Sequence, residues 1–259
     1  PICEAYGTLF GTSYVRDANG NVVVDANGLP KISTTNKTLG KFTPDWTGGI
    51  SNTFSYRSLS LSFLIDASVG GSIFSNTNKT GKYTGVLANT LSGRDAEHGG
   101  LWYYTAAMGN NVRLPESPSY SVSSDGLYYA QVNGQSTRVY QDGIMVEGVT
   151  ESGSKNEEVV SAEKYYHRIY SIAEANVYDA SYVKLREVAL SYRLPRLWTQ
   201  KLHLQEASVT LTGRNLWTIY KSVPNIDPES ALTTGNAQGV EAYSLPTTRS
   251  FGVNLSVKF

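Results

Sequence analysis

Few side chains in this sequence are of the types, and at the spacings, that catalysis or metal binding requires. The three histidines, His98, His167 and His203, are widely separated, and Cys3 is the only cysteine. The sequence contains no Gly-x-Ser-x-Gly motif, no His-Glu-x-x-His motif and no phosphate-binding loop. It therefore predicts a protein that is not an enzyme and that needs no metal or cofactor.

Two groups of side chains could still contact a ligand. Trp102, Tyr103 and Tyr104 form an aromatic run that could stack on sugar rings. Packing inside an ordered loop is the favoured interpretation, because an exposed aromatic cluster needs independent support. Arg214 and Asp66 lie on the polar side of predicted strands. We expect them to pair with other charges, since a charge in an enclosed interior needs a partner, and contact of Arg214 with a ligand is the alternative.

Three acidic segments could either bind a cation or form turns. Residues 17–20 and 25–28 both read Asp-Ala-Asn-Gly. Asn-Gly is a strong signal for a tight turn, because both residues tolerate positive φ. The first segment also begins like a calcium loop, but Val22 and Gly28 stand where that loop needs glycine and a bidentate glutamate. Turns are therefore favoured, and the same holds for residues 227–229, because Asp-Pro commonly starts a turn.

Five segments alternate apolar and polar residues, which is the period of a strand with one apolar and one polar face. They are residues 47–56, 59–69, 181–194, 207–216 and 247–259. The apolar set of the last segment consists of Phe251, Val253, Leu255, Val257 and Phe259. At roughly 3.3 Å per residue and a steep tilt, its thirteen residues could cross a bilayer. We interpret it as the closing strand of an outer-membrane β-barrel.

The connections between these strands alternate in length. Residues 57–58 and 195–206 make short links, whereas the other connections and the leader are long. Barrels of the bacterial outer membrane have short periplasmic turns and long extracellular loops. The predicted fold class is therefore all-β, an antiparallel transmembrane β-barrel segment with long extracellular loops. The predicted parts are an extracellular leader 1–46, a transmembrane hairpin 47–73, a long extracellular loop 74–180, a second transmembrane hairpin 181–216, an extracellular loop 217–246 and the closing strand 247–259.

The long connection 74–180 is too long to lack structure of its own. Its pattern predicts a hairpin formed by residues 127–132 and 136–140. It also predicts a short helix over residues 163–175, where apolar side chains recur every three to four positions.

The composition and the sheet edges narrow the class of protein further. Lys+Arg and Asp+Glu both number 22, so the chain lacks the basic excess of a nucleic-acid-binding protein. Its apolar runs are too short for a membrane helix, and residues 1–4 do not begin a signal peptide. Five strands leave two open sheet edges, which lipid does not tolerate. We therefore expect the remaining strands to come from an upstream polypeptide, with the natural N-terminus elsewhere.

A series of motifs over nearly the whole of residues 6–259 resembles SusC/RagA-type TonB-dependent outer-membrane transporters. The motifs are Pro44-Asp45-Trp46-Thr47-Gly48-Gly49, Leu59-Ser60-Leu61-Ser62-Phe63, Ala180-Ser181-Tyr182-Val183-Lys184-Leu185-Arg186-Glu187, Leu190-Ser191-Tyr192-Arg193-Leu194-Pro195, Gly213-Arg214-Asn215-Leu216-Trp217, Asp227-Pro228-Glu229 and Leu245-Pro246-Thr247-Thr248-Arg249-Ser250-Phe251-Gly252. Each motif is weak alone, and their order and spacing make the match specific.

The resemblance implies a barrel of about 22 strands with a plug in its lumen, of which this chain is the C-terminal part. It implies the outer membrane of a Gram-negative bacterium of Bacteroidetes type, energy supplied through TonB, and a SusD-like surface lipoprotein as partner. The family imports oligosaccharides, peptides or other nutrients too large for porins. The plug and the TonB-contacting segment lie upstream in the family. Asp66 and Arg214 would face the lumen, and the apolar set ending at Phe259 would carry the barrel-assembly signal. Trp46 and Trp198 fit interfacial aromatic girdles.

Two other interpretations remain open. A soluble secreted β-protein, such as a lectin or an adhesin, would account for the 18 tyrosines and 24 glycines and would fold without detergent. A passive porin or an outer-membrane assembly protein would use the same barrel. It would differ from the importer in lacking the upstream plug and the TonB-contacting segment.

Overall fold

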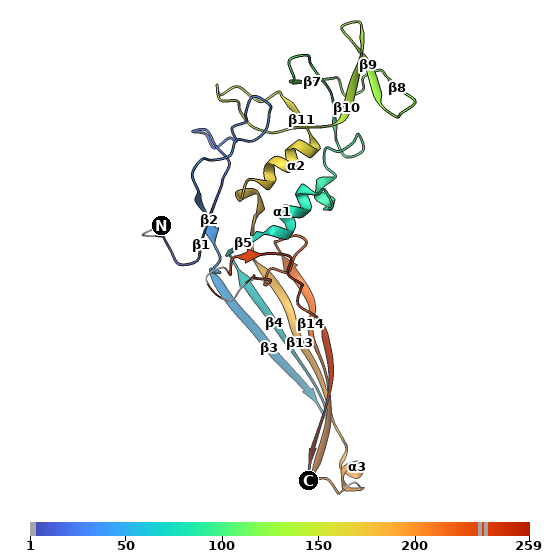
Figure 1. Ribbon diagram of the computed structural model, residues 1–259. Helices are drawn as coiled ribbons and strands as arrows, with labels where there is room; N and C mark the ends of the chain where they lie inside the picture. The colour runs from blue at the N-terminus through green and yellow to red at the C-terminus, as the bar shows by residue number, and fades with distance from the viewer. Residues whose placement is uncertain (1–3, 202, 233–234, 236–237) are drawn as a thin grey trace. The chain divides into compact units, whose positions relative to one another are not determined.

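A computed structural model describes residues 4–201, 203–232, 235 and 238–259. The chain divides into two compact units. Unit 1 consists of Pro1–Leu9, Gly40–Ser75 and Tyr178–Phe259, and unit 2 consists of Phe10–Leu39 and Asn76–Val177. Most regular structure in both units is antiparallel β-sheet, which confirms the predicted all-β fold class (Figure 1).

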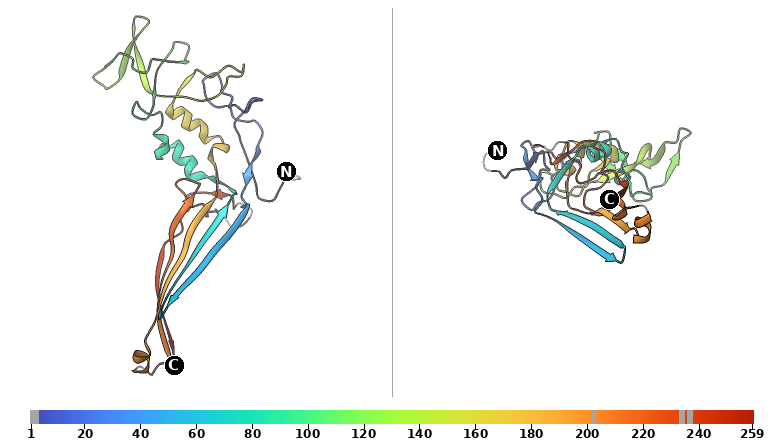
Figure 2. Two further views of the ribbon diagram at one scale, coloured as in Figure 1. Left: turned by 180° about the vertical axis from the view of Figure 1, so that it is seen from behind. Right: turned by 90° about the horizontal axis from the view of Figure 1, so that it is seen from below.

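A five-stranded antiparallel sheet dominates unit 1. Its strands are β3 Trp46–Tyr56, β4 Leu59–Val69, β13 Tyr182–Arg193, β14 Glu206–Lys221 and β16 Ser250–Lys258. Their order is β16-β14-β13-β4-β3, so each strand pairs with its predecessor or successor among the five. The two short links and the C-terminus lie at the same end of the sheet (Figure 2). All five strands were predicted from the alternation of apolar and polar residues.

The closing strand is shorter than predicted, with nine residues in place of thirteen. Thr247, at its predicted start, donates its backbone N–H and its hydroxyl to the Asp227 carboxylate, at 3.2 and 2.5 Å. These bonds hold the backbone before Ser250 to the preceding loop, so the ladder to β14 begins only at Ser250, opposite Arg214. The prediction overlooked this competition for the backbone.

The register of the sheet aligns side chains of one kind into rows that cross all five strands. Cross-strand partners point to the same face of a sheet. One apolar row consists of Phe54, Leu61, Leu190, Leu211 and Val253. The neighbouring polar row consists of Ser55, Ser60, Ser191, Thr210 and Asn254. Unit 1 therefore has one continuous apolar face and one continuous polar face.

The apolar face is uncovered over much of its area. Leu211 retains 51% of its exposure and Val253 73%, and the terminal Phe259 retains 84%. A soluble monomer rarely exposes a contiguous apolar patch of this extent. The two edge strands of the sheet are β3 and β16. Each pairs with one neighbouring strand within the described part of the chain.

Smaller elements complete unit 1. The strands β5 Ser72–Ser75, β12 Val177–Asp179 and β15 Val240–Glu241 form a three-stranded sheet. Ile73, Val223 and Ile226 pack together as a buried cluster. The short link between β13 and β14 contains the helix α3, Arg196–Lys201.

The strands β1 Thr8–Gly11 and β2 Lys37–Lys41 pair in a separate two-stranded sheet, and the residues of each strand are divided between the two units.

Unit 2 is built around the long strand β10, Gln135–Met145. The other strands of its sheet are β6 Leu101–Thr105, β7 Asn111–Arg113, β8 Tyr120–Val122, β9 Tyr128–Val132 and β11 Val159–Ser161. The predicted hairpin is present as β9 and β10. It turns at Asn133 and Gly134, whose φ angles are 51° and 78°.

Short helices complete unit 2. They are α1 Asn76–Tyr83, α2 Ala162–Tyr170, η1 Ala88–Thr90 and η2 Glu174–Asn176. The predicted helix over 163–175 ends early, because the Asn176 side-chain amide donates to the carbonyls of Ile169 and Ile172, both at 3.1 Å, and so caps the helix end. Of the helices in the described residues, none has the length and the apolar character needed to span a membrane.

Candidate functional site

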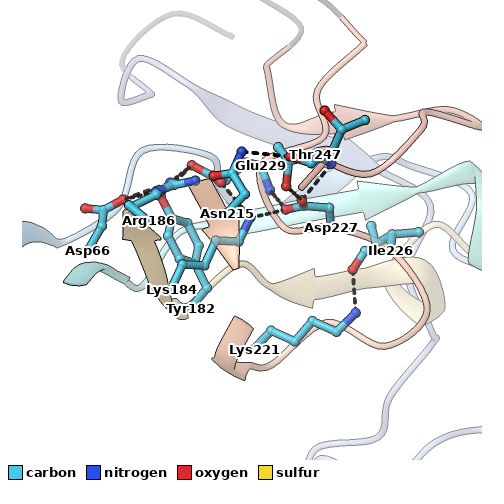
Figure 3. Close-up of polar contacts among 11 residues, drawn as sticks. Asp66, Tyr182, Lys184, Arg186, Asn215, Lys221, Ile226, Asp227, Glu229 and Thr247 are labelled. Carbon is cyan, nitrogen blue, oxygen red and sulfur yellow. Dashed lines mark hydrogen bonds and ion pairs between the residues drawn. The ribbon is translucent and has the colours of Figure 1, made fainter. Parts of the chain in front are cut away.

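The polar face of the five-stranded sheet carries a cluster of ionised side chains (Figure 3). The cluster lies at the start of β13, whereas α3 follows the end of that strand. We define the charged cluster as Asp66 of β4, Lys184 and Arg186 of β13, and Asp227 and Glu229 of the loop after β14. The two cations come from one sequence motif, and two of the three carboxylates come from another motif about forty residues later. The cluster therefore brings together segments that the sequence analysis treated separately.

Lys184 lies at the centre of the cluster and is only 2% exposed. Its Nζ contacts Asp227 Oδ1 at 2.5 Å and Glu229 Oε2 at 2.6 Å. A buried ammonium is tolerated only where carboxylates or other acceptors replace its water shell. The two loop carboxylates supply that replacement.

Arg186 occupies a β-bulge. Its neighbours Leu185 and Glu187 lie opposite Ile65 and Leu64, which are consecutive, so Arg186 is the extra residue. The Arg186 Nε and Nη2 donate to Asp66 Oδ2 at 2.9 and 2.8 Å, and Nη2 also contacts Glu229 Oε1.

The bulge also changes which residues of β13 face each side. Before it, the odd-numbered Val183 and Leu185 share the apolar face, and after it the even-numbered Val188 and Leu190 do. This shift of parity is visible in the sequence. It could have predicted the bulge, which the sequence analysis missed.

Asp227 joins the start of its loop to the end. Besides Lys184, it accepts the backbone N–H of Glu229 at 3.1 Å and both donors of Thr247. Burial by itself would raise the pKa of Asp227, but the hydrogen bonds from Lys184 and Thr247 outweigh it and lower the pKa to about 2. Asp227 is therefore a structural anion, and the turn interpretation of residues 227–229 agrees with its bond to the Glu229 N–H.

Acid should release this loop only at strongly acidic pH. The folded pKa of Asp227, about 2, lies below the usual 3.8, so the charged carboxylate stabilises the fold. That contribution is fully present above pH of about 4 and is lost as the pH falls through about 2. Cleavage of residues 230–246 by pepsin should therefore rise as the pH falls from 4 to 2. In an Asp227→Asn variant it should already be high at pH 4, and equal cleavage of both proteins at pH 4 would contradict the assignment.

The other predicted lumen charge, Arg214, stands apart from the charged cluster. Its Nε lies 2.9 Å from Glu187 Oε2, on the neighbouring strand, and its side chain is 66% exposed. Asp66 pairs with Arg186 inside the cluster. Both predicted charges thus have partners within this chain, and contact of Arg214 with a ligand stays a prediction.

The predicted aromatic run lies in unit 2, on β6. Trp102 and Tyr103 are buried, at 6% and 5% exposure, and Tyr104 is half-buried. The Trp102 ring packs against Tyr120 and Tyr128, with ring centres 4.9 and 5.4 Å away. This is the packing role that the sequence analysis favoured. A ligand would have to displace these rings, and ligand binding here stays a prediction.

Replacing Tyr103 tests the packing role. Its hydroxyl donates to Asp142 Oδ1 at 3.1 Å. Tyr103→Phe should therefore lower the stability of the β6–β10 region by about 2 kcal/mol, the usual value of a hydrogen bond to a charged group. Faster hydrogen exchange of residues 101–105 and 140–145 in the intact protein would report this loss. Unchanged exchange of both segments would contradict the packing role.

The two Asp-Ala-Asn-Gly segments form the predicted turns. Asp17 Oδ1 accepts the N–H groups of Asn19 and Asn21, at 2.9 and 2.8 Å, and Gly20 and Gly28 have φ angles of 87° and 76°. The carboxylate of Asp17 thus closes its own turn. No group of three or more histidine, cysteine or acidic side chains is placed to hold a metal ion in the described ranges.

Comparison with known proteins shows that the chain is similar to a TonB-dependent receptor. It is 26% identical over 263 aligned positions to the TonB-dependent receptor P3 of Formosa agariphila, in a match that covers 99% of this chain and 20% of that protein. The chain thus spans about a fifth of the length of this curated relative. No family model matches the chain. The predicted resemblance to TonB-dependent transporters is confirmed.

Two solved structures of the RagAB peptide importer also match. The closed-closed state is 17% identical, with 98% of this chain and 24% of that chain covered and a TM-score of 0.47. The open-open state is 16% identical, with 98% and 23% covered and a TM-score of 0.47.

Proposed function

We propose that this chain is the C-terminal barrel part of a TonB-dependent importer in the outer membrane of a Gram-negative bacterium of Bacteroidetes type. Its cargo is an oligosaccharide or another large nutrient, and it works with a SusD-like surface lipoprotein. The match to receptor P3 over 99% of the chain supports the class of protein. The two-faced five-stranded sheet is the single observation that carries the proposal.

The apolar face suits contact with hydrocarbon. A transmembrane barrel needs an outward apolar band about 25 Å tall on strands tilted by about 35–45°. The strand β4 has 11 residues, and at about 3.3 Å per residue and about 40° tilt it rises roughly 25 Å. Aromatic side chains lie toward both ends of this face, Tyr56 and Tyr192 at one end and Trp46 and Trp217 at the other. The sheet thus has both the height and the aromatic borders of a membrane band.

The polar face and the open edges complete the argument. Serine, threonine and the Arg214–Glu187 pair suit the wall of a water-filled lumen. In lipid, the outer edges of β3 and β16 would leave backbone groups without hydrogen bonds, at several kcal/mol each. Further strands of the same polypeptide would pair with them, and a plug and a TonB-contacting segment would belong to that polypeptide too.

Energised uptake by the intact polypeptide tests this function. Cells carrying the full-length gene should take up at least one member of a labelled panel of oligosaccharides and peptides. That uptake should stop when TonB is deleted or when an uncoupler collapses the proton gradient. Uptake that persists without TonB would favour a passive porin, and a protein recovered soluble from the medium would favour the secreted lectin or adhesin.

A further inference from the structure

The loop between β14 and β16 is fastened at three points. Asp227, near its start, accepts hydrogen bonds from Lys184 and from Thr247, which lies near the end of the loop. Between them, Glu241 is fully buried, and its carboxylate accepts Ser75 Oγ at 2.7 Å and the Ser244 N–H at 3.1 Å. The loop therefore has fixed points at residues 227, 241 and 247.

The segment between the last two fixed points is held in a strained conformation. Tyr243 has a φ of +56°, a region that bulky side chains adopt only where the surroundings impose it. Tyr243 is 66% exposed and Leu245 is 90% exposed. The bonds at residues 241 and 247 thus hold Tyr243 in an unfavourable backbone conformation, with the side chains of Tyr243 and Leu245 exposed.

The register shows from which side the loop approaches the sheet. Lys184 lies opposite Asp66, and Asp66 shares the face of Ser62 and Ser60 on β4. The loop carboxylate of Asp227 contacts Lys184, and that of Glu229 contacts Arg186. The loop therefore reaches the sheet from its polar face. The apolar face takes no part in the charged cluster.

We propose that residues 226–232 and 238–247 are folded onto the polar face of the sheet as a fixed inward fold, which narrows the outer end of the passage that the barrel encloses. The proposal rests on the proposed function, because the polar face lines a passage only if the sheet belongs to a closed barrel. The fold is fixed because lifting it would separate the nearly inaccessible Lys184 from both of its loop carboxylates. It limits the width of the passage permanently and does not open and close.

Distances between spin labels in the intact transporter, reconstituted in lipid, test the position of the fold. One label replaces Ser230, next to Glu229, and the other replaces either Asn254 on the polar face or its neighbour Val253 on the apolar face. The mean distance to position 254 should be shorter than that to 253 by several ångströms, with a narrow distribution. A shorter distance to 253, or a broad distribution for both, would overturn the proposal.

A charge variant tests what holds the fold. Lys184→Met should broaden the 230–254 distribution and raise the hydrogen exchange of residues 226–232 by at least about a hundredfold, as expected when a buried ion pair loses one partner. Arg214→Gln breaks an exposed pair on the same face and should change neither reading. If Lys184→Met does not assemble, Glu229→Gln replaces it. A narrow distribution that persists in the assembled variant would overturn the proposal.

The barrel is tested independently by the accessibility of labels on the apolar face. If those labels lie in water, the proposed function itself fails. If those labels lie in lipid but the 230–254 distance is not the shorter one or is broadly distributed, only the inward fold is rejected.

Discussion

Replacing Val188 with arginine should destabilise the assembled protein in lipid by about 2–4 kcal/mol, whereas replacing its neighbour Ala189 should cost much less. The two residues are consecutive on β13, the middle strand of the sheet, at the same height and on opposite faces. Val188 lies in the apolar row with Phe63, and Ala189 in the polar row with Ser62. If the apolar face contacts hydrocarbon, only the arginine that replaces Val188 has to lose its water shell.

The comparison can be made on the intact polypeptide reconstituted in vesicles. Denaturant titration, followed by the heat-modifiable shift in gel mobility, gives the stability of each variant relative to the parent. Because both variants add the same side chain, effects of size and of strand propensity largely cancel. Equal destabilisation by the two arginines, or a larger loss for Ala189→Arg, would mean that hydrocarbon does not contact the apolar face.

The second large effect concerns the charged cluster. Asp227→Leu should destabilise the loop by about 3–5 kcal/mol, because Lys184 stays buried with one carboxylate in place of two. Lys184→Met should cost a similar amount. The double variant, Lys184→Met with Asp227→Leu, should lose clearly less than the sum of the two, since it leaves neither of these partners buried alone.

Limited proteolysis of residues 230–246 measures these losses. When opening is fast compared with cleavage, the cleavage rate follows the equilibrium population of the open loop, so ratios of rates give the differences in free energy. Strict additivity of the two substitutions would show that Lys184 and Asp227 do not stabilise the fold as a pair.

The strands were predictable because their signal is local. Alternation of apolar and polar residues places Val253 and Asn254 on opposite faces wherever the strand lies, and the two-residue turn at Arg57 and Ser58 follows from two adjacent alternating runs. The resulting sheet order needed no further information, because every strand pairs with a sequential neighbour among the five.

Some departures from regular alternation were not recognised. The bulge at Arg186 appears in the sequence as a change of parity between Leu185 and Val188, which was treated as one continuous strand. The helix α1 was missed because its sequence, Asn-Thr-Asn-Lys-Thr-Gly-Lys-Tyr, consists largely of poor helix formers. Tertiary contacts override local propensity in that segment.

The charged cluster could not be predicted from local patterns. Asp66, Lys184 and Asp227 are far apart in the chain, and each alone looks like a solvated charge or a turn residue. Only the register of β4 and β13 and the path of the last loop bring them into one cluster, in which Lys184 bonds Asp227 and Asp66 bonds Arg186. The motifs that carried the family resemblance nevertheless contain Lys184, Arg186, Asp227 and Glu229, which contact one another in the cluster.

A site-directed spin-label scan of β16 in the intact, reconstituted protein tests most directly the claim that the sheet separates lipid from an aqueous lumen. Labels at positions 251, 253, 255 and 257 should be accessible to oxygen dissolved in lipid. Labels at positions 250, 252, 254 and 256 should be accessible to a water-soluble relaxation agent, so that accessibility alternates with period two. Uniform accessibility to the water-soluble agent along the strand, or the opposite alternation, would contradict the account.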